Sequence, residues 1–397
     1  MTPVLAVLNA GSSSLKFSVY RGDLPALLLR GQVEGLGTTP RFVVRDAAGV
    51  PLADEAVSGA HVDAFRHFSA WLRERYPGSS LSAVGHRVVH GGMHYAEPVL
   101  VDDAVLARLE SLVPLAPLHQ PHNLSAIRAV REASPRLPQV ACFDTAFHRR
   151  HAKVVERYAL PGRFHQDGIR RYGFHGLSYE YVAQAFREKA PGVAGGRVIV
   201  AHLGSGASLC ALEGGRSVDT TMGFSALDGL PMATRSGSVD PGVLLYLLRE
   251  AGLSPGDLER LLYNESGLLG LSGLSGDMRA LLASDAPEAR EAVEYFVFRV
   301  NRELGALMAV LGGLDALVFT AGVGENSAEI RRRICQAAAW TGLVLDEAAN
   351  RTGGPCISEA GTRPSAWVIP TDEEQMIARH TLSVLGRPGA TISIRTT

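Results

Sequence analysis

Lysine is scarce in this chain of 397 residues, since only Lys16, Lys153 and Lys189 occur among its 39 basic residues. Neither sign of charge dominates, because 40 acidic residues leave a formal net charge of -1. This balance gives no electrostatic reason to expect a nucleic acid or an anionic membrane as a partner. The rarity of lysine makes the position of each one informative.

Cysteine is also scarce, and the few cysteines lie far apart without a CxxC pair, at Cys142, Cys210, Cys335 and Cys356. This spacing predicts neither a disulfide framework nor a zinc ribbon, and it fits a reducing compartment. The N-terminal apolar run is interrupted at Asn9 and has no basic segment before it. The most apolar later stretch, residues 304–314, is too short to span a bilayer. The sequence therefore predicts a cytoplasmic protein without a membrane segment.

Short β-branched runs alternate with amphipathic helical patterns along the chain, as in α/β proteins. At roughly 150 residues per domain, a chain of this length is enough for two or three domains. The apolar runs predict strands over residues 4–8, 83–89, 139–143, 198–202, 316–320 and 366–369. The helical patterns predict helices over residues 61–76, 123–132, 179–189, 241–251, 288–311, 328–340 and 372–385.

One internal similarity bears on the domain organisation. Residues 7–15 resemble residues 200–208, because each segment is an apolar strand followed by a Gly-Ser turn. The equivalent glycines, Gly11 and Gly204, are 204 − 11 = 193 positions apart, which is close to half of the chain. This spacing suggests two halves of one architecture, each with a loop of backbone amides after its first strand. A match this short also arises by chance.

Two glycine-containing segments have the composition of phosphate-binding loops. In NAGSSSLK (9–16), small residues expose backbone amides and Lys16 adds a positive charge, although the GxxxxGK(S/T) spacing is absent. A flexible serine-rich turn is the alternative. Residues 318–327 run into the helix predicted from 328, whose dipole would favour phosphates. Ser327 stands where a dinucleotide motif has its third glycine, so a nicotinamide cofactor is disfavoured.

Three segments place arginine beside small residues, at 86–92, 171–176 and 232–239. An arginine in this setting presents a planar fork to carboxylate or phosphate oxygens. Taken singly, each is more often a surface arginine near a turn. Three histidines spaced four apart would form a metal-binding face on a helix, but the valines and glycines between them indicate a strand and a turn, so no metal site is predicted at His86, His90 and His94.

Two acidic residues complete the candidates. Asp144 follows the apolar run of residues 140–143, at the C-terminal end of a predicted strand, where α/β active sites gather. Glu373 lies at the start of the last predicted helix, where a capping carboxylate is an equally good explanation. A carboxylate among arginines is either an ion-pair partner or a group that positions Mg²⁺ and the nucleophile.

Taken together and in order, these motifs resemble the acetate kinase family over essentially the whole chain. The segments that carry the resemblance are LNAGSSSLKF (8–17), GHRVVHGG (85–92), PLAPLH (114–119), FDTAFH (143–148), RYGFHG (171–176), AHLGSGASL (201–209), SGDMR (275–279), FTAGVGEN (319–326) and PTDEE (370–374). The resemblance implies an α/β, duplicated two-domain fold like that of actin, sugar kinases and Hsp70 (the ASKHA fold), with the active site in the interdomain cleft. It also implies an acyl- and phosphate-side domain of residues 1–146 plus about 376–397, and a nucleotide-binding domain of residues 147–375.

The same resemblance implies roles for individual residues. Mg²⁺, with Mn²⁺ as an alternative, would be held by Asn9 and Glu373. Four residues would form the catalytic set. Arg87 would bind the substrate and Asp144 would be the essential carboxylate. His175 and Arg235 would stabilise the transition state. The transferred phosphate would lie near Ser12, Ser14 and Lys16. The acyl methyl group would contact Val89, Leu118 and Phe174, with His119 beside them. ATP would be bound by Lys16, His202, Leu203, Gly204, Ser205, Gly206, Asp277, Met278, Arg279, Gly322, Val323, Gly324, Glu325 and Asn326.

The implied reaction is the reversible transfer of a phosphoryl group from ATP to acetate, giving ADP and acetyl phosphate by direct in-line displacement. A carboxylate is already a competent nucleophile at neutral pH, so no general base is needed. The site must supply alignment and positive charge around the transferred group. From the family alone, a homodimer is expected.

The chain departs from the family pattern at a few positions. Ser205 replaces the asparagine of the nucleotide loop, and Ser238 stands where an aspartate is usual. The usual Thr-Ser-His after GFHG is here Leu177, Ser178 and Tyr179, and Ala226 stands where many members have proline. These departures bear on phosphate-donor affinity and acyl selectivity.

Two other interpretations remain open. A propionate kinase shares these motifs and differs mainly in the width of the acyl pocket. A non-catalytic nucleotide switch of the actin or Hsp70 kind would use ATP only to change shape. Against the switch, four residues have no evident role in it, namely Arg87, Asp144, His175 and Arg235.

Overall fold

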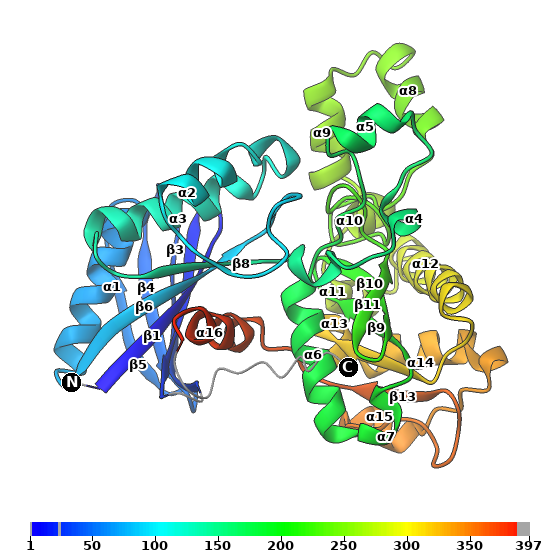
Figure 1. Cartoon of the computed structure of the whole chain (residues 1–397). Coiled ribbons are helices and arrows are strands. Elements are labelled where there is room, and N and C mark those ends of the chain that lie inside the picture. Colours follow the sequence, from blue (N-terminus) through cyan, green and yellow to red (C-terminus); the bar gives the residue numbers. More distant parts are fainter. Residues whose placement is uncertain (1, 23–24, 387–397) are drawn as a thin grey trace. The chain divides into compact units, whose positions relative to one another are not determined.

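The computed structural model describes residues 2–22 and 25–386 of the chain (Figure 1). These residues form two compact units, each built on its own sheet. The first unit consists of the residues up to Ala146 together with those from Asp372 onward, and the second runs from Phe147 to Thr371. No helix in the described ranges combines the length and the apolar composition that crossing a membrane requires.

The first unit contains an eight-stranded sheet in the order β5-β4-β3-β2-β1-β6-β8-β7. Strands β1 to β5 form an antiparallel meander, and β6 and β8 continue the sheet parallel to β1. The bounds are β1 Thr2–Ala10, β2 Ser14–Arg21, β3 Ala26–Glu34, β4 Arg41–Asp46, β5 Pro51–Ala56, β6 Ser79–Val88, β7 Val99–Leu100 and β8 Gln139–Phe143.

Two helices, α1 (His61–Arg75) and α3 (Gln120–Ala133), cover one face of this sheet. Their apolar sides share a core with β1 to β4, in which the rings of Phe17 and Phe68 are 4.4 Å apart. The polar residues on either side of Phe17 in β2 point to the opposite face of the sheet, because successive side chains of a strand alternate between the two faces.

Helix α16 (Glu373–Val384) packs on that opposite face, against β6 and β8. Gly85 permits the close approach, since a Cβ atom there would lie 2.4 Å from Thr381 Oγ1 and 2.7 Å from Ile377 Cγ2. Arg87 is two residues further along β6 and therefore projects from the same face as Gly85. The packing of α16 thus brings its first turn to the side of the sheet that carries Arg87.

The second unit contains a five-stranded sheet in the order β11-β10-β9-β12-β13. Helices α6 (Gly176–Lys189) and α7 (Pro191–Ala194) pack on one face, with Val182 and Phe186 against alternate residues of β9 and β10. The long helix α12 (Pro287–Leu311) packs against β9, β10 and β11 from the other side (Figure 1). The strand bounds are β9 Arg197–Leu203, β10 Ala207–Glu213, β11 Arg216–Thr220, β12 Ala316–Thr320 and β13 Ser365–Val368.

Shorter helices and turns of helix connect these elements. In the first unit they are α2 Asp103–Glu110 and the 3₁₀ turn η1 Val113–Leu115, and the turn η2 Ala146–His148 leads into the second unit. In the second unit they are α4 Lys153–Glu156, α5 Gly162–Gln166, α8 Pro241–Arg249, α9 Pro255–Asn264, α10 Gly267–Ser272, α11 Met278–Leu282, α13 Ala321–Asn326, α14 Ala328–Ala337, η3 Ala339–Thr341 and α15 Glu347–Thr352.

The two sheets share one topology, which confirms the predicted duplication. The orders β3-β2-β1-β6-β8 and β11-β10-β9-β12-β13 both consist of three antiparallel strands followed by two parallel ones. The similar segments 7–15 and 200–208 lie in the equivalent hairpins β1/β2 and β9/β10. In the first hairpin Asn9 pairs with Lys16, and in the second His202 pairs with Ser208.

Candidate active site

The first group of predicted residues meets at the ends of two neighbouring strands. Arg87 lies on β6. Asp144 is the residue directly after the end of β8, which pairs with β6 in parallel. The guanidinium donates from Nε to Asp144 Oδ1 (3.0 Å) and from Nη2 to Asp144 Oδ2 (2.6 Å). This bidentate, charge-assisted pair fixes the plane of the guanidinium. The Asp144 side chain is only 2% exposed, so water screens the pair little.

Glu373 joins the pair from α16, with its Oε2 atom 3.7 Å from Arg87 Nε. The alternative role of Glu373 as a helix cap is wrong, because the N-cap residue is Asp372, whose Oδ1 accepts from the Gln375 amide at 2.8 Å. The Glu373 carboxylate is therefore available to the predicted site.

Burial alone would lower the pKa of Arg87, but the charges of Asp144 and Glu373 and the hydrogen bonds to Asp144 raise it well above its ordinary value. The arginine therefore stays charged at every pH at which the protein works. Two carboxylates around one guanidinium leave one excess negative charge, which suits a cation bound nearby.

The segment 9–16 contains the predicted turn after the first strand, but the turn is short and belongs to a hairpin. Gly11 donates its amide to the carbonyl of Ser14 (2.8 Å), which leaves a short turn that includes the exposed Ser12. Strand β2 begins at Ser14, and Lys16 is paired with Asn9 across the two strands. Directly paired residues place their side chains on the same face, so the lysine and the amide lie side by side there.

The same face of β2 leads to the start of α16. Ser18, two residues after Lys16, donates from Oγ to Glu374 Oε2 (2.5 Å). Arg30 on β3 donates to Asp372 Oδ2 (3.0 Å). These bonds on both sides of Glu373 hold the first turn of α16 against the sheet.

The donors predicted for Mg²⁺ have the right chemistry. An amide oxygen from Asn9 and a carboxylate from Glu373 are hard oxygen ligands, and Mg²⁺ usually takes one or two protein carboxylates together with substrate phosphates and waters. No group of three histidine, cysteine, aspartate or glutamate side chains suited to a metal occurs within residues 2–22 and 25–386. An ion held by these two donors would take its remaining ligands from a substrate phosphate and water.

The predicted acyl contacts of the first unit lie next to helix α3. The Val89 amide donates to Asn123 Oδ1 (3.0 Å), and Gln120 bonds the backbone of His90 in both directions (3.1 and 3.2 Å). His119 is the N-cap residue of α3. Val89 is buried, whereas Leu118 is 42% exposed.

In the second unit, His175 stands at the start of α6 and rests on the β9/β10 hairpin. Its ring stacks on that of His202 at 4.1 Å, and its Nδ1 atom is hydrogen-bonded to Ser208 Oγ (2.8 Å). Among the described residues, His175 (φ 58°) and Ala321 (φ 64°) are the non-glycine residues with a left-handed backbone. Such conformations cost roughly 1–3 kcal/mol each and cluster at functional sites.

His148, which the sequence did not single out, stabilises the backbone just before His175. It is buried, and its Nε2–H donates to the carbonyl of Phe174 (2.9 Å) while Nδ1 bonds Ser217 Oγ (2.8 Å). Burial lowers the pKa of His148 to about 4, so the ring is neutral at pH 7. The residue closes the quoted motif FDTAFH, but nothing in the sequence predicted a contact with Phe174.

Arg235 and His175 face the same glycine. A Cβ atom at Gly206 would lie 3.3 Å from His175 Nε2 and 3.8 Å from Arg235 Nη1. The Arg235 guanidinium is placed by a hydrogen bond to the Ala226 carbonyl (3.3 Å), and the Ala233 amide donates to the carbonyl of Ser205 (3.1 Å). A histidine, an arginine and a glycine turn therefore converge, and such a group suits an anion with several oxygens.

The predicted nucleotide segment 322–326 is itself helical, so the expected loop before the next helix is wrong. It forms most of α13, where Glu325 Oε1 accepts from the amides of Ala321 (2.8 Å) and Thr371 (3.1 Å). The buried guanidinium of Arg331, which sequence reasoning also missed, donates to the carbonyls of Gly324 (2.9 Å) and Glu325 (2.7 Å). These bonds fix the short helix from both of its ends.

Of the predicted nucleotide residues 277–279, Asp277 and Arg279 lie on the surface of the second unit, whereas Met278 is buried. Asp277 caps α11 by accepting from the Arg279 amide (2.8 Å), and the two side chains form an ion pair at 2.8 Å. The Arg279 side chain is 90% exposed. An exposed pair adds little to stability and is open to a ligand.

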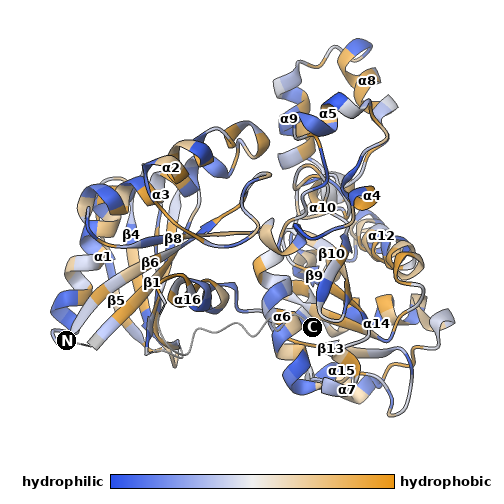
Figure 2. Cartoon of the chain, in the orientation of Figure 1, coloured by the Kyte–Doolittle hydropathy of each residue, from blue (hydrophilic) through white to orange (hydrophobic). Residues whose placement is uncertain are grey.

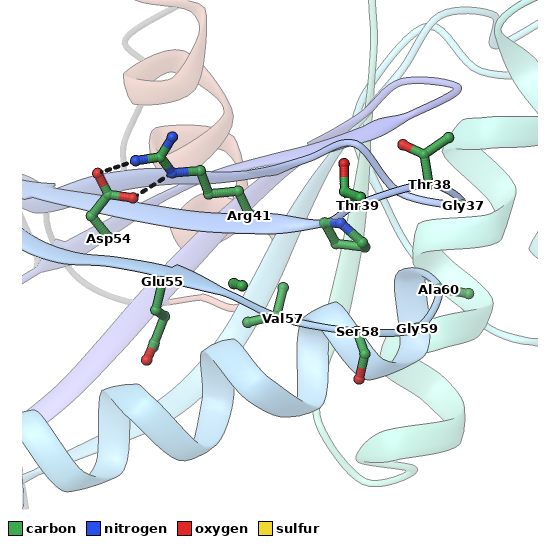
Figure 3. A pocket seen from close by; sticks show the side chains of 12 residues that line it. Gly37, Thr38, Thr39, Arg41, Asp54, Glu55, Val57, Ser58, Gly59 and Ala60 are labelled. Carbon is green, nitrogen blue, oxygen red and sulfur yellow. Dashed lines mark hydrogen bonds and ion pairs between the residues drawn. The ribbon is translucent and has the colours of Figure 1, made fainter.

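A separate hollow lies in the first unit, lined by residues 37–41 and 54–60 (Figure 3). None of the predicted site residues lines it. Its arginine and one of its carboxylates already bind each other, with Arg41 Nε 2.6 Å from Asp54 Oδ1. The clusters of predicted site residues, and not this hollow, mark the candidate site.

Comparison with known proteins identifies the family of the chain. A family model described as the acetokinase family matches residues 4–379. The chain is 56% identical over 388 residues to an acetate kinase of Nitrobacter hamburgensis, with 96% of each sequence covered, and 52% identical over 392 residues to an acetate kinase of Rhizobium meliloti, covering 97% and 99%. Among solved structures, it resembles a propionate kinase from Francisella tularensis (TM-score 0.90, 37% identity, 96% and 99% covered) and an acetate kinase from Porphyromonas gingivalis (TM-score 0.88, 36% identity, 96% and 100% covered).

Proposed function

Because the chain belongs to the acetokinase family, we propose that it catalyses the reversible, ATP-dependent phosphorylation of acetate to acetyl phosphate. The observation that carries the proposal is the convergence on Gly206, where His175 Nε2 and Arg235 Nη1 would lie 3.3 and 3.8 Å from an added Cβ atom. Phosphoryl transfer needs positive charge around three oxygens more than it needs acid or base chemistry, and this arrangement supplies it.

Arg87 and Asp144 of the first unit are proposed to act on the acyl side of the reaction. Arg87 uses two of its five N–H groups on Asp144, so the guanidinium keeps donors for a substrate carboxylate. The acetate oxygen attacks as a carboxylate, and no residue has to remove a proton from it. Val89, Leu118 and Phe174 are proposed to contact the methyl group, with His119 beside them.

The phosphate-donor side is proposed to use the glycine-containing segments 202–206 and 322–326 of the second unit. His175 and Arg235 are proposed to bind the transferred phosphoryl oxygens, and residues 202–206, 277–279 and 322–326 to bind ATP. Ser12, Ser14 and Lys16 are proposed to approach the transferred group from the first unit. Asn9 and Glu373 would hold Mg²⁺, or Mn²⁺ in its place, and the ion would neutralise phosphate charge.

An acetate-dependent assay of ADP release tests the function directly. We expect ADP to form only when acetate is present, and ATP to form from ADP and acetyl phosphate in the reverse direction. A nucleotide switch would release ADP at a rate indifferent to acetate. That result would remove the proposed function.

Acyl-chain choice gives a finer test. A methylene group in an apolar pocket is worth ~1–3 kcal/mol, so we expect acetate to be preferred, propionate to be used within roughly 10–200-fold in kcat/KM, and butyrate to be poor. Ala226, whose carbonyl accepts from Arg235, stands where proline is usual. Alanine leaves more room than proline at this position. We therefore expect Ala226→Pro to narrow the acyl pocket and to sharpen the preference for acetate.

Steady-state kinetics with the three acids and both proteins decide the point. A wild-type preference for propionate would make the chain a propionate kinase. Identical ratios in the two proteins would show that position 226 does not shape the acyl site.

We propose a homodimer and a cytoplasmic location as well. The four cysteines are free thiols, as expected in a reducing compartment. Helix α8 is strongly apolar yet has no fully buried residue, and it exposes Val243, Leu245 and Tyr246 (Figure 2). An apolar helix face that its own chain leaves uncovered suits a second copy.

Tyr246→Glu should convert the dimer to a monomer, because it places a charge on the uncovered face. Size-exclusion chromatography with light scattering measures the mass. Val154→Glu, at a side chain that is exposed elsewhere on the second unit, is the matched control and should leave the mass unchanged. A wild-type protein that is monomeric at micromolar concentration contradicts the proposal.

A further inference from the structure

The side-chain amide of Asn123 on α3 joins the ends of two neighbouring strands of the first unit. Its Oδ1 atom accepts from the amide of Val89, the residue after β6 (3.0 Å), and its Nδ2 atom donates to the carbonyl of Ala10, the last residue of β1 (3.2 Å). The orientation of the amide is fixed, because a backbone N–H only donates and a backbone carbonyl only accepts. All three residues are buried, so water does not compete for these bonds.

In an unbroken sheet these two backbone groups would bond each other. β1 pairs with β6 in parallel as far as Leu8 and His86. In a parallel ladder, a carbonyl that points to the next strand accepts from the amide one residue beyond its register partner. Two residues further along, Ala10 would be the partner of Val88, so its carbonyl would accept from the amide of Val89. The Asn123 side chain therefore takes the place of one backbone hydrogen bond of the sheet.

Gln120, one turn before Asn123 on α3, serves the next residue of the chain. Its Oε1 atom accepts from the amide of His90 (3.2 Å), and its Nε2 atom donates to the carbonyl of His90 (3.1 Å). A buried backbone group without a partner destabilises a fold. The two side-chain amides of α3 thus let residues 89 and 90 leave the sheet with their hydrogen bonds made.

The two strands separate where the residues of the candidate site lie. Asn9 precedes Ala10 on β1, and Arg87 and Val89 stand at the end of β6. The register of the two strands places Asn9 next to Arg87. In open α/β sheets, ligands bind in the crevice outside the carboxyl ends of the strands. The spacing of these two ends therefore bears directly on the room for a substrate.

We propose that Asn123 is a positioning residue that holds the ends of β1 and β6 apart by the width of one amide group, and that it thereby sets the room for the acyl group beside Val89. It acts through the backbone, to which both of its polar atoms are bound. The effect on acyl selectivity rests on the proposed function, in which Val89 contacts the methyl group. The spacing of the strands does not rest on it.

Crystal structures of the wild type and of Asn123→Ala test the spacing without any substrate. Alanine removes the amide, so we expect the strand ends to close and the Val89 amide to donate directly to the Ala10 carbonyl, at about 2.9 Å. Asn123→Ser covers the case in which the alanine variant does not fold. Its single hydroxyl is too short to reach both ends, so they should lie closer together than in the wild type. Ends that stay as far apart as in the wild type overturn the proposal.

Acyl selectivity is the second readout, because a variant that is only destabilised loses activity toward every acid alike. With the gap closed, the longer acid should lose more. We expect the ratio of kcat/KM for propionate to that for acetate to fall on the order of 10-fold in Asn123→Ala.

Gln139→Ala is the matched control. It removes another buried side-chain amide of the same unit, one that is bonded to His86 (2.7 Å) and lies at the start of β8. The control should keep the wild-type ratio of the two acids.

The outcomes separate this proposal from the proposed function. An active wild type whose ratio is unchanged in Asn123→Ala contradicts the role in selectivity and leaves the function intact. A wild type that phosphorylates neither acid contradicts the proposed function, while the crystal structures still decide the spacing of the strands.

Discussion

Arg235→Ala should lower kcat by on the order of 10²–10⁴ while the melting temperature stays nearly unchanged, because the charge that it removes matters only where charge develops in the reaction. Among its contacts, the guanidinium donates to two neutral acceptors, the Ala226 carbonyl (3.3 Å) and Met232 Sδ (3.8 Å). Arg235 contributes to the fold through its backbone, because its carbonyl accepts a hydrogen bond from the Met232 amide (3.0 Å). Alanine keeps that bond.

The measurement is kcat by steady-state kinetics together with a thermal melt of each protein. Arg260→Ala is the matched control, because Arg260 is an exposed arginine of the same unit, paired with Glu265 at 2.9 Å and remote from the predicted motifs in sequence. An Arg235→Ala protein that turns over normally, or one that does not fold, would remove Arg235 from the catalytic set.

The sequence was most informative where one pattern dominated a segment. Strands β8 and β12 are uninterrupted apolar runs, and their ends were predicted from those runs alone. Strand β3 was missed because Arg30, Gly31 and Gln32 interrupt its alternation, and only the neighbouring strands stabilise it in the sheet. Strand β2 was hidden in the same way, because the serines before it indicated a loop.

The candidate site, too, could be predicted only where a local pattern marked the residue. Asp144 was recognisable as a carboxylate at a strand end, but its bidentate pair with Arg87 depends on β6 and β8 being neighbours, which no local pattern encodes. The ambiguity at Glu373 disappeared once Asp372 proved to be the cap. The supports behind His175, namely His148, Ser208 and Tyr179, come from three separate segments, and only folding brings them together.

Asp144→Asn should abolish turnover. The side chain accepts two hydrogen bonds from Arg87 and is almost fully buried. An amide of the same shape loses the negative charge and places its own N–H donor against an N–H donor of Arg87. Arg87 then loses the partner that fixes its plane, and the excess negative charge that favours a cation is also lost. Removing one partner of a buried ion pair destabilises the fold, so a lower melting temperature should accompany the loss of activity, although Glu373 still lies 3.7 Å from Arg87.

The control separates the reaction from the ion pair itself. Asp315 in the second unit binds Arg197 in the same bidentate way, with both nitrogen–oxygen distances at 3.0 Å, and it lies outside the predicted site. Asp315→Asn should therefore leave kcat unchanged, although it removes a similar pair. Turnover of both variants is measured as a function of Mg²⁺ at a temperature where each is folded, as monitored by circular dichroism. If Asp144→Asn keeps most of its activity with the same Mg²⁺ dependence, Asp144 only supports the fold; if it is folded and inactive while Asp315→Asn works normally, the carboxylate acts in the reaction through Arg87 and the ion.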